Sequence, residues 1–328
     1  MNFNQLKNLG PASLAPMAGV ADSAFRALCK QFGAALVTSE MISIKALLMK
    51  DKKTAELLWH SDLEEPFAVQ LFGDDPELFA RCVPIIESLG PAFIDINMGC
   101  PAPKIAGNGA GSALLKDPQK CRDIMAACVG ASKGVPITAK IRTGFTEDTK
   151  NGLEVAKLLQ DAGAHYITVH GRTRERMYTP PVDLDSIAAI KSALSVPVVG
   201  NGDIYTPEDA KNMLDTCKVD HLYIGRGALG SPWIFAQINE YLKDGRVTTH
   251  LTPKEKFDCL LWQASKAIEQ KGEKRAMSEM RKHAAWYFKG WRGAAALRRD
   301  AGKLATYEDL KTLVAAALIS YEEDPDAI

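Results

Sequence analysis

The 328-residue sequence predicts an α/β protein: a (β/α)8 TIM barrel followed by a small all-helical C-terminal domain. Three observations support this fold class. Eight short apolar runs recur along the chain, each run ends in small or polar residues, and helical spacing of apolar residues follows several of them. Because the runs lack a clear alternation of apolar and polar residues, they fit parallel strands covered on their outer face. An open, doubly wound sheet is the alternative arrangement.

Each predicted strand is a short stretch rich in aliphatic or aromatic residues. The eight runs are Ser13–Met17, Ala35–Thr38, Phe67–Leu71, Phe93–Ile96, Ile137–Ile141, Tyr166–Val169, Val196–Gly200 and His221–Ile224. Between them, helical spacing predicts helices at Ser23–Phe32, Pro76–Leu89 and Leu153–Ala162, and Thr206 followed by Pro207 predicts a further helix start. The barrel is therefore expected to occupy residues 1–242.

The pattern changes after residue 242, and residues 250–328 are expected to form the helical domain. Thr252 and Glu255 make a capping box at the start of one helix. Two more helices are predicted at about Lys274–Lys289 and Tyr307–Tyr321, and Asp324–Asp326 is expected to fray.

Composition limits the class of protein. Forty Lys and Arg balance forty Asp and Glu, so the net charge indicates no polyanionic partner. Seven cysteines without short paired spacing argue against a disulfide framework and a zinc site, and no metal is expected. No signal peptide and no apolar run of membrane-spanning length is found, so we expect a cytoplasmic protein without a membrane partner.

The stretch that follows the fourth predicted strand carries the most distinctive chemistry. Cys100 stands in the loop Asn97–Pro103, where two prolines and Gly99 prevent a regular strand or helix. A cysteine in a stiff loop past a buried strand is a candidate catalytic thiol. Taken alone, such a cysteine is more often a small buried residue, so its role depends on its neighbours.

Polar residues also follow the other strands, where the active sites of barrels are built. The loops Asn201–Asp203 and Gly225–Gly227 follow the last two strands, a common place for a phosphate site. The run 225–230 matches G-x-G-x-x-G, but no second βα unit with an acidic residue follows, so a dinucleotide fingerprint is rejected. A mononucleotide flavin fits better: Pro16–Ala18 offers an apolar floor, Gln70 offers hydrogen bonds, and Lys140 offers a positive charge.

Several motifs taken together resemble one family. They are APMAGVADSAFR, SEMIS, VQLFG, DINMGCPAPK, GAGSALLKDP, KIRTG, HGRTRERMY, NGDI, IGRGALGSPWIF and RKHAAWY, in order across nearly the whole chain. They are similar to the bacterial tRNA-dihydrouridine synthases. The resemblance implies an FMN-bound barrel, a helical tRNA-binding domain, and reduction of a tRNA uridine with NADPH as the nicotinamide reductant. The segment 179–184 departs from the family pattern, which leaves the RNA contacts of this loop open.

The resemblance also implies roles for individual residues. Cys100 is expected to donate a proton to C5 of uracil after a hydride from reduced flavin has reached C6. The expected FMN contacts are Pro16, Met17, Ala18, Gln70, Lys140, His170, Asn201, Gly202, Asp203, Gly225 and Arg226. Apart from the resemblance, the chemistry of the residues suggests that Asn97 binds the uracil edge, with Arg172 and Lys104 near phosphate or base.

A basic stretch marks the expected RNA surface. Between Lys271 and Lys303 there are ten Lys or Arg and three Asp or Glu, a difference of +7. Arg275 and Lys282 share the polar face of one predicted helix, and Trp286 stands beside them as a candidate stacking ring. A solvated charged face explains the same pattern in an isolated helix.

Two other functions stay open. One is a barrel flavoenzyme for a free pyrimidine, such as a dihydroorotate dehydrogenase, although the basic helical domain has no purpose there. The other is a non-catalytic RNA-binding protein, which the intact Cys100 and the flavin-edge residues disfavour. A monomer is expected.

Overall fold

The computed structural model describes residues 1–291 and 293–323; the predicted frayed segment Asp324–Asp326 lies outside them. Eight parallel strands close into a barrel in the order β1 to β8, with β1 paired to both β2 and β8. The strands are β1 Ala12–Leu14, β2 Val37–Ser43, β3 Phe67–Phe72, β4 Phe93–Met98, β5 Ile137–Gly144, β6 Ile167–Thr173, β7 Val198–Asn201 and β8 His221–Ile224. The TIM barrel prediction is confirmed, and the open sheet is excluded.

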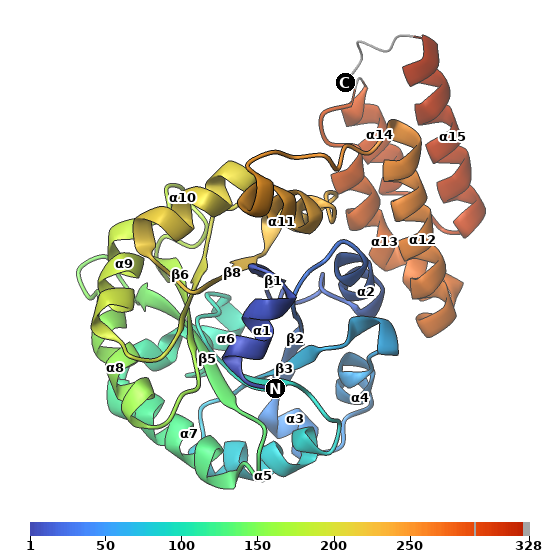
Figure 1. Ribbon diagram of the computed structural model, residues 1–328. Helices are drawn as coiled ribbons and strands as arrows, with labels where there is room; N and C mark the ends of the chain where they lie inside the picture. Colours follow the sequence, from blue (N-terminus) through green and yellow to red (C-terminus); the bar gives the residue numbers. More distant parts are fainter. Residues whose placement is uncertain (292, 324–328) are drawn as a thin grey trace.

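Helices surround the barrel and also close one of its ends (Figure 1). The helices of the barrel region are α1 Phe3–Leu9, α2 Ser23–Gln31, α3 Ile44–Leu48, α4 Lys52–Leu58, α5 Pro76–Glu87, α6 Pro103–Ala106, α7 Pro118–Ala131, α8 Gly152–Asp161, α9 Leu184–Ala193, α10 Pro207–Cys217 and α11 Ile234–Asp244. Short 3-10 turns are η1 Asp62–Glu64, η2 Gly111–Lys116 and η3 Arg226–Ala228. Helix α1 buries Phe3 and Leu6 against the amino-terminal end of the barrel, beside Tyr166 and Tyr223.

The core explains why the strands read as nearly continuous apolar runs. Strand side chains such as Ile94, Ile96 and Val169 are fully buried beneath the surrounding helices, so one contiguous apolar cluster links sheet and helices. Strands β2, β4, β5 and β6 continue past the predicted apolar runs into polar residues. These extensions bring the strand ends to the mouth of the barrel, where the candidate site lies.

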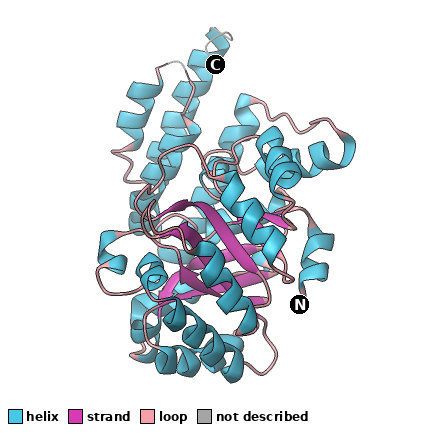
Figure 2. Ribbon diagram, turned by 90° about the vertical axis from the view of Figure 1, so that its left-hand side faces the viewer, coloured by secondary structure: helices cyan, strands magenta, loops and turns pink. Residues whose placement is uncertain are grey.

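The C-terminal helices project from one side of the barrel (Figure 2). They are α12 Pro253–Lys271, α13 Glu273–Tyr287, α14 Ala294–Ala301 and α15 Tyr307–Glu323. They share their own apolar cluster, which includes Phe257, Met280 and Phe288. Helix α14 was not predicted, so the count of helices in this region was wrong. The cause is its length of eight residues, too short to establish a clear apolar stripe.

The helical domain packs on the barrel through helix α2. Ala24 of α2 meets Ala267 of α12 and Ala276 of α13, three small side chains that allow close approach of the helices. Phe25 lies at a centroid distance of 5.3 Å from His283 of α13. Across the described residues, no helix is long and apolar enough to cross a bilayer.

Candidate active site

A cavity of about 560 Å³ opens at the carboxyl ends of the strands. Cys100, Asn97 and all eleven residues predicted to contact a flavin line it. These side chains come from segments distributed between positions 16 and 226, and the closed barrel brings them together because parallel strands end at the same face. The volume lies within the range of about 300–1,000 Å³ that small-molecule sites occupy.

The loop that carries Cys100 is fixed by hydrogen bonds from three sides. The backbone N–H groups of Gly99 and Cys100 both donate to Oδ1 of Asn97, at 3.1 and 2.9 Å. Arg142 donates to the carbonyl of Gly99 at 2.8 Å, and Ser112 donates to the carbonyl of Cys100 at 3.1 Å. These bonds hold the backbone of the loop in place where Cys100 lines the cavity.

Cys100 is also set apart by its exposure. Five other cysteines are buried, and burial raises the pKa of those thiols, to about 12 for Cys121. Only Cys100 and Cys259 are partly exposed, and of these two only Cys100 lines the cavity. The interpretation of Cys100 as a small buried residue is therefore wrong.

Lys140 stands at the cavity with an unusual electrostatic environment. Burial, together with the nearby guanidinium of Arg142, lowers the pKa of Lys140 to about 8. Within residues 1–291 and 293–323, no hydrogen bond or ion pair engages its ammonium group. A largely buried cation without a partner is costly, so this position favours an electron-rich ligand group.

His170 lies among the same cations. Burial and the positive charges of Lys140 and Arg142 lower the pKa of His170 well below its ordinary value. The imidazole is therefore neutral at physiological pH, and it acts as a hydrogen-bond donor at one nitrogen and an acceptor at the other.

The loops after β7 and β8 are joined through a carboxylate. Asp203 accepts hydrogen bonds from Arg172 and from Arg226, the second at 2.9 Å. Arg226 keeps a partly exposed guanidinium at the cavity, near the ring of Tyr178 at 5.0 Å. Asp203 therefore fixes the direction of the one cation that the two loops offer for an anionic group.

Two of the predicted cradle glycines have no room for a side chain. A Cβ on Gly227 would lie 2.0 Å from the carbonyl oxygen of Ile204, and one on Gly202 would lie 2.8 Å from Val182. Gly202 also has a φ of +126°, a conformation that favours glycine. The backbone of both loops therefore runs close to neighbouring segments while its open side faces the cavity.

Arg172 engages groups of its own chain. Its guanidinium is buried and donates to Asp203 and to the carbonyl of Thr179, so it links the loops that follow β6 and β7. An RNA contact at Arg172 would require one of these hydrogen bonds to be exchanged, and it stays a prediction. Lys104 remains exposed on the short helix α6 beside the cavity mouth.

Sequence reasoning missed several cavity residues. Met41, Met177, Tyr178 and Tyr205 line the cavity, and Asp95 lies behind it within the barrel. The motif containing Met177 and Tyr178 was noticed only as part of the resemblance. Their contribution to the cavity follows from the turn after β6, which carries both residues back over the strand ends.

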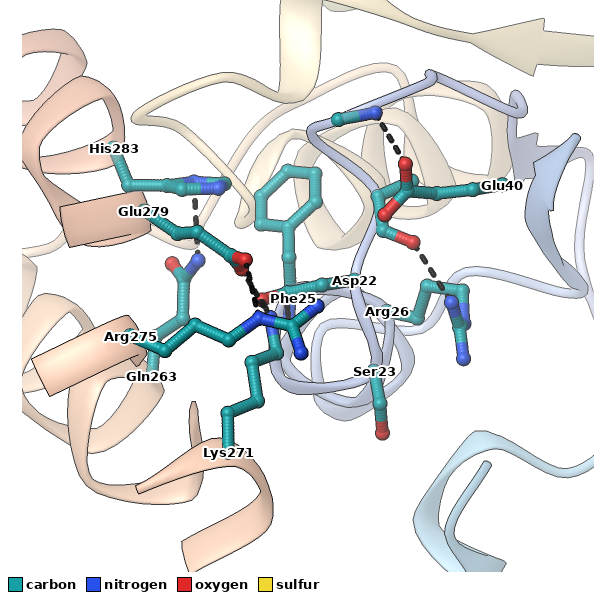
Figure 3. A network of polar contacts seen from close by, with 12 residues as sticks. Asp22, Ser23, Phe25, Arg26, Glu40, Gln263, Lys271, Arg275, Glu279 and His283 are labelled. Carbon is teal, nitrogen blue, oxygen red and sulfur yellow. Dashed lines mark hydrogen bonds and ion pairs between the residues drawn. The ribbon is translucent and has the colours of Figure 1, made fainter. Parts of the chain in front are cut away.

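Arg275 and Lys282, predicted to bind RNA, line a second cavity of about 690 Å³ between the barrel and helices α12 and α13. Figure 3 shows the polar side chains that converge there. Arg275 pairs with Glu56 of α4 and Glu279, and Lys282 donates to the carbonyl of Gly19. Both cations thus engage groups of their own chain.

The same cleft contains a nearly buried ion pair. Lys271 bonds to Asp22 at the start of α2 and to Glu279 of α13. Burial alone would raise the pKa of Asp22, but the charge of Lys271 holds that pKa below its ordinary value. The pair links the helical domain to the barrel.

Trp286 is half-buried, with its ring edge-on to His283 at 5.1 Å. Part of the ring is therefore accessible, and its stacking on a base stays a prediction. Its backbone closely approaches Gly230 after β8, where a Cβ would lie 2.6 Å from a Trp286 backbone atom. Trp286 accordingly marks the contact between the helical domain and the loop that follows η3.

Within the described residues, no group of three or more His, Cys, Asp or Glu side chains is arranged to hold a metal ion. The groups that converge on the first cavity are instead amides, cations and a thiol. This set suits an organic ligand with polar edges and a negatively charged end.

Comparison with known proteins identifies close relatives. Histamine dehydrogenase from Rhizobium sp. 4-9 shares the barrel fold, with a TM-score of 0.56, 12% identity, and coverage of 78% of this chain and 49% of that chain. tRNA-dihydrouridine synthase B of Pseudomonas syringae pv. tomato is 44% identical over 285 residues, 87% of this chain and 84% of the relative. The synthase B of Vibrio cholerae serotype O1 is 41% identical over 302 residues, 92% of this chain and 93% of the relative. The sequence model of the dihydrouridine synthase (Dus) family matches residues 13–321. This match spans the barrel and the helical domain alike, and the chain belongs to the dihydrouridine synthase family.

Proposed function

We propose that this protein is an FMN-dependent tRNA-dihydrouridine synthase that reduces the C5=C6 bond of a tRNA uridine. The observation that carries the proposal is the convergence of Cys100, Lys140 and the two glycine loops on one cavity. Family membership supports the substrate class, because the relatives named above are tRNA-dihydrouridine synthases. NADPH, which the motif resemblance suggests, is the proposed source of electrons.

The residues present fit a flavin mononucleotide. The unpaired ammonium of Lys140 suits the electron-rich pyrimidine edge of the ring system, and Gln70 offers amide hydrogen bonds beside it. Pro16, Met17 and Ala18 form an apolar wall of the same cavity. At the other end, the open backbone of the loops 201–203 and 225–227, with Arg226, suits one phosphate group.

The cofactor, when reduced, supplies the hydride that C6 of the uracil requires. The protein must then supply a proton to C5, because hydride addition leaves negative charge on C5 and on the C4 carbonyl. The thiol of Cys100 gives that proton, and the resulting thiolate is reprotonated from solvent. One hydride and one proton thus convert the double bond into a single bond and yield dihydrouracil.

Asn97 and Lys104 are proposed to contribute to substrate binding at the mouth. The Oδ1 atom of Asn97 is already used by the Cys100 loop, so Asn97 acts on the substrate mainly by placing the thiol. Lys104 is exposed beside the mouth and suits a phosphate of the RNA strand that enters the cavity. The uridine must leave its stack to reach the cavity.

The tRNA body is proposed to lie along the helical domain, close to α13. Arg275, Lys282 and Trp286 are proposed contacts, and RNA phosphates would have to exchange with the carboxylates and the carbonyl that hold the two cations. We propose that the protein acts as a monomer in the cytoplasm. Reduction of a free pyrimidine is a less favoured function, because it gives no purpose to the basic helices.

Mass mapping of dihydrouridine in tRNA from cells with and without the protein tests this proposal. We expect one or more uridine positions to be about two mass units heavier in tRNA from cells with the protein than in tRNA from cells without it. The purified protein should be yellow, and Cys100→Ala should keep the flavin while dihydrouridine formation falls by about 10²-fold or more. Unchanged tRNA from cells that lack the protein, together with turnover of free uracil derivatives, would favour the free-pyrimidine reductase.

A further inference from the structure

A chain of side-chain hydrogen bonds runs through the barrel from a buried carboxylate to the loop of the thiol. Thr138 and Gln70 donate to the two oxygens of Asp95, both at 2.7 Å. Asn97 donates to Oε1 of Gln70 at 2.8 Å, and its own oxygen accepts the N–H groups of the Cys100 loop. Three strands, β3, β4 and β5, and one loop thus share a single polar path.

The two ends of this chain determine the direction of every bond within it. A carboxylate accepts hydrogen bonds and donates none, so the NH2 group of Gln70 must face Asp95. The oxygen of Gln70 then faces Asn97, which must turn its own NH2 group toward it. The oxygen of Asn97 is left for the backbone N–H groups of Gly99 and Cys100, which are fixed donors.

Burial makes this direction important. Asp95 is fully buried and Gln70 is 1% exposed, so water does not offer substitute partners. If Gln70 and Asn97 turned over, the NH2 group of Asn97 would face two backbone N–H groups, and three donors would meet without an acceptor. Such an arrangement costs free energy in a buried site, and the oxygen of a turned-over Gln70 would also face the carboxylate of Asp95 without a donor between them. The carboxylate and the two backbone N–H groups therefore select the same amide orientations from opposite ends of the chain.

We propose that Asp95 is a positioning residue whose buried carboxylate orients the amides of Gln70 and Asn97 and thereby holds Cys100 at the cavity wall. The same orientation leaves the second N–H of Gln70 for the ligand in the cavity. Asp95 lies behind the cavity lining and so acts only through its neighbours. The catalytic meaning of this inference rests on the proposed function, but the positioning of the Cys100 loop can be tested in the apoprotein.

Asp95→Asn is the decisive change, because asparagine has the same shape but is able to adopt either hydrogen-bond direction. The measurement is the rate at which iodoacetamide alkylates Cys100 in the apoprotein, followed by peptide mass spectrometry with Cys259 as internal reference. We expect the alkylation rate of Cys100 to rise about fivefold, which corresponds to the loss of about one hydrogen bond. The alkylation rate of Cys259 should not change. The visible absorption band of the bound flavin should also shift, because the polarity of Gln70 at its edge changes.

A double-mutant cycle distinguishes positioning from general loosening of the fold. Asn97→Ala cuts the chain next to the thiol loop, so Asp95→Asn should add almost nothing to the Cys100 rate in that background. Glu64→Gln is the matched control, since Glu64 is equally buried but pairs with Arg26 away from the cavity. It should lower thermal stability without a change in the relative rate of Cys100.

These experiments distinguish a failure of the positioning role of Asp95 from a failure of the proposed function. Additive effects of Asp95→Asn and Asn97→Ala on Cys100, or an unchanged rate in Asp95→Asn, would overturn the positioning role. If Asp95→Asn does not fold, Gln70→Met cuts the same path while it leaves the carboxylate, and it should raise the Cys100 rate equally. An inactive wild-type protein would remove the proposed function, whereas the alkylation cycle in the apoprotein would still decide the role of Asp95.

Discussion

If Lys140 binds the flavin as proposed, its lowered pKa should make flavin affinity depend on pH. The fall from 10.5 to about 8 means that the site favours the neutral amine by about 3 kcal/mol relative to water. An electron-rich edge of the flavin favours the ammonium form instead. Below pH 8 the empty site already holds the ammonium, and above pH 8 binding must take up a proton.

The expected size of the effect follows from this linkage. The dissociation constant of FMN should be about tenfold higher at pH 9 than at pH 7, because about nine in ten empty sites then hold a neutral amine. The assay is a titration of apoprotein that follows the quenching of FMN fluorescence at a series of pH values. Free FMN serves as the reference for any change in the ligand itself.

Two variants identify Lys140 as the titrating group. Lys140→Arg keeps a positive charge over the whole range, so its affinity should change little between pH 7 and pH 9. Lys140→Met lacks the charge and should bind more weakly at pH 7, again without the dependence on pH. The reasoning is refuted if the wild-type affinity is flat, or if Lys140→Arg shows the same tenfold fall.

Three further predictions concern the loops, the domain contact and the RNA surface. Gly227→Ala should cost about 1–3 kcal/mol of stability and weaken FMN binding, because its Cβ would collide with the backbone; thermal melts and the same titration measure both. Asp22→Asn should lower the unfolding free energy at pH 7 by about 1–3 kcal/mol, since Lys271 loses its barrel partner and keeps only Glu279, and denaturant titrations should show this cost shrinking as acid protonates Asp22 in the wild type. Lys289→Ala should weaken tRNA binding and reduce the slope of log affinity against log salt by about 1, with flavin affinity unchanged.

Each of these predictions has a matched control. Gly134→Ala adds a Cβ that meets nothing within 4 Å, so an equal loss of FMN binding there would contradict the cradle argument. Asp215→Asn removes an exposed pair with Lys211 and should barely change stability. If Arg275→Ala, which removes a cation already paired with carboxylates, reduces the salt slope more than Lys289→Ala, the assignment of free and engaged cations is wrong.

The convergence of the residues proposed to bind the flavin followed from the sequence because parallel strands leave little freedom. Once eight βα repeats are recognised, the residue after each strand must lie at one end of the barrel, whatever the details of the helices. Cys100, Lys140 and the loops 201–203 and 225–227 were found in this way, and all of them line one cavity. The motif resemblance sharpened the roles of these residues, but the strand ends alone located them.

Residues inside the barrel were harder to recognise. Asp95 sits between Ile94 and Ile96 in a strand that reads as core, and a single carboxylate in an apolar run does not reveal its partners. Whether it faces the barrel interior depends on the register of β4 against β3 and β5, which pairs Gln70 with Asp95 and Asp95 with Thr138. That register is a property of the closed sheet and not of the strand sequence.

The number of cations available to RNA was also difficult to predict from the sequence. A helical wheel considers α13 alone, but Arg275 pairs with Glu56, which lies 219 positions earlier, and Lys271 pairs with Asp22. These cations therefore stabilise the contact between the domains, and RNA phosphates would have to compete with carboxylates to reach them. The count of +7 between Lys271 and Lys303 consequently overstates the charge available to RNA. Exposed cations outside the cleft lining, such as Lys289, should then account for most of the salt dependence of binding.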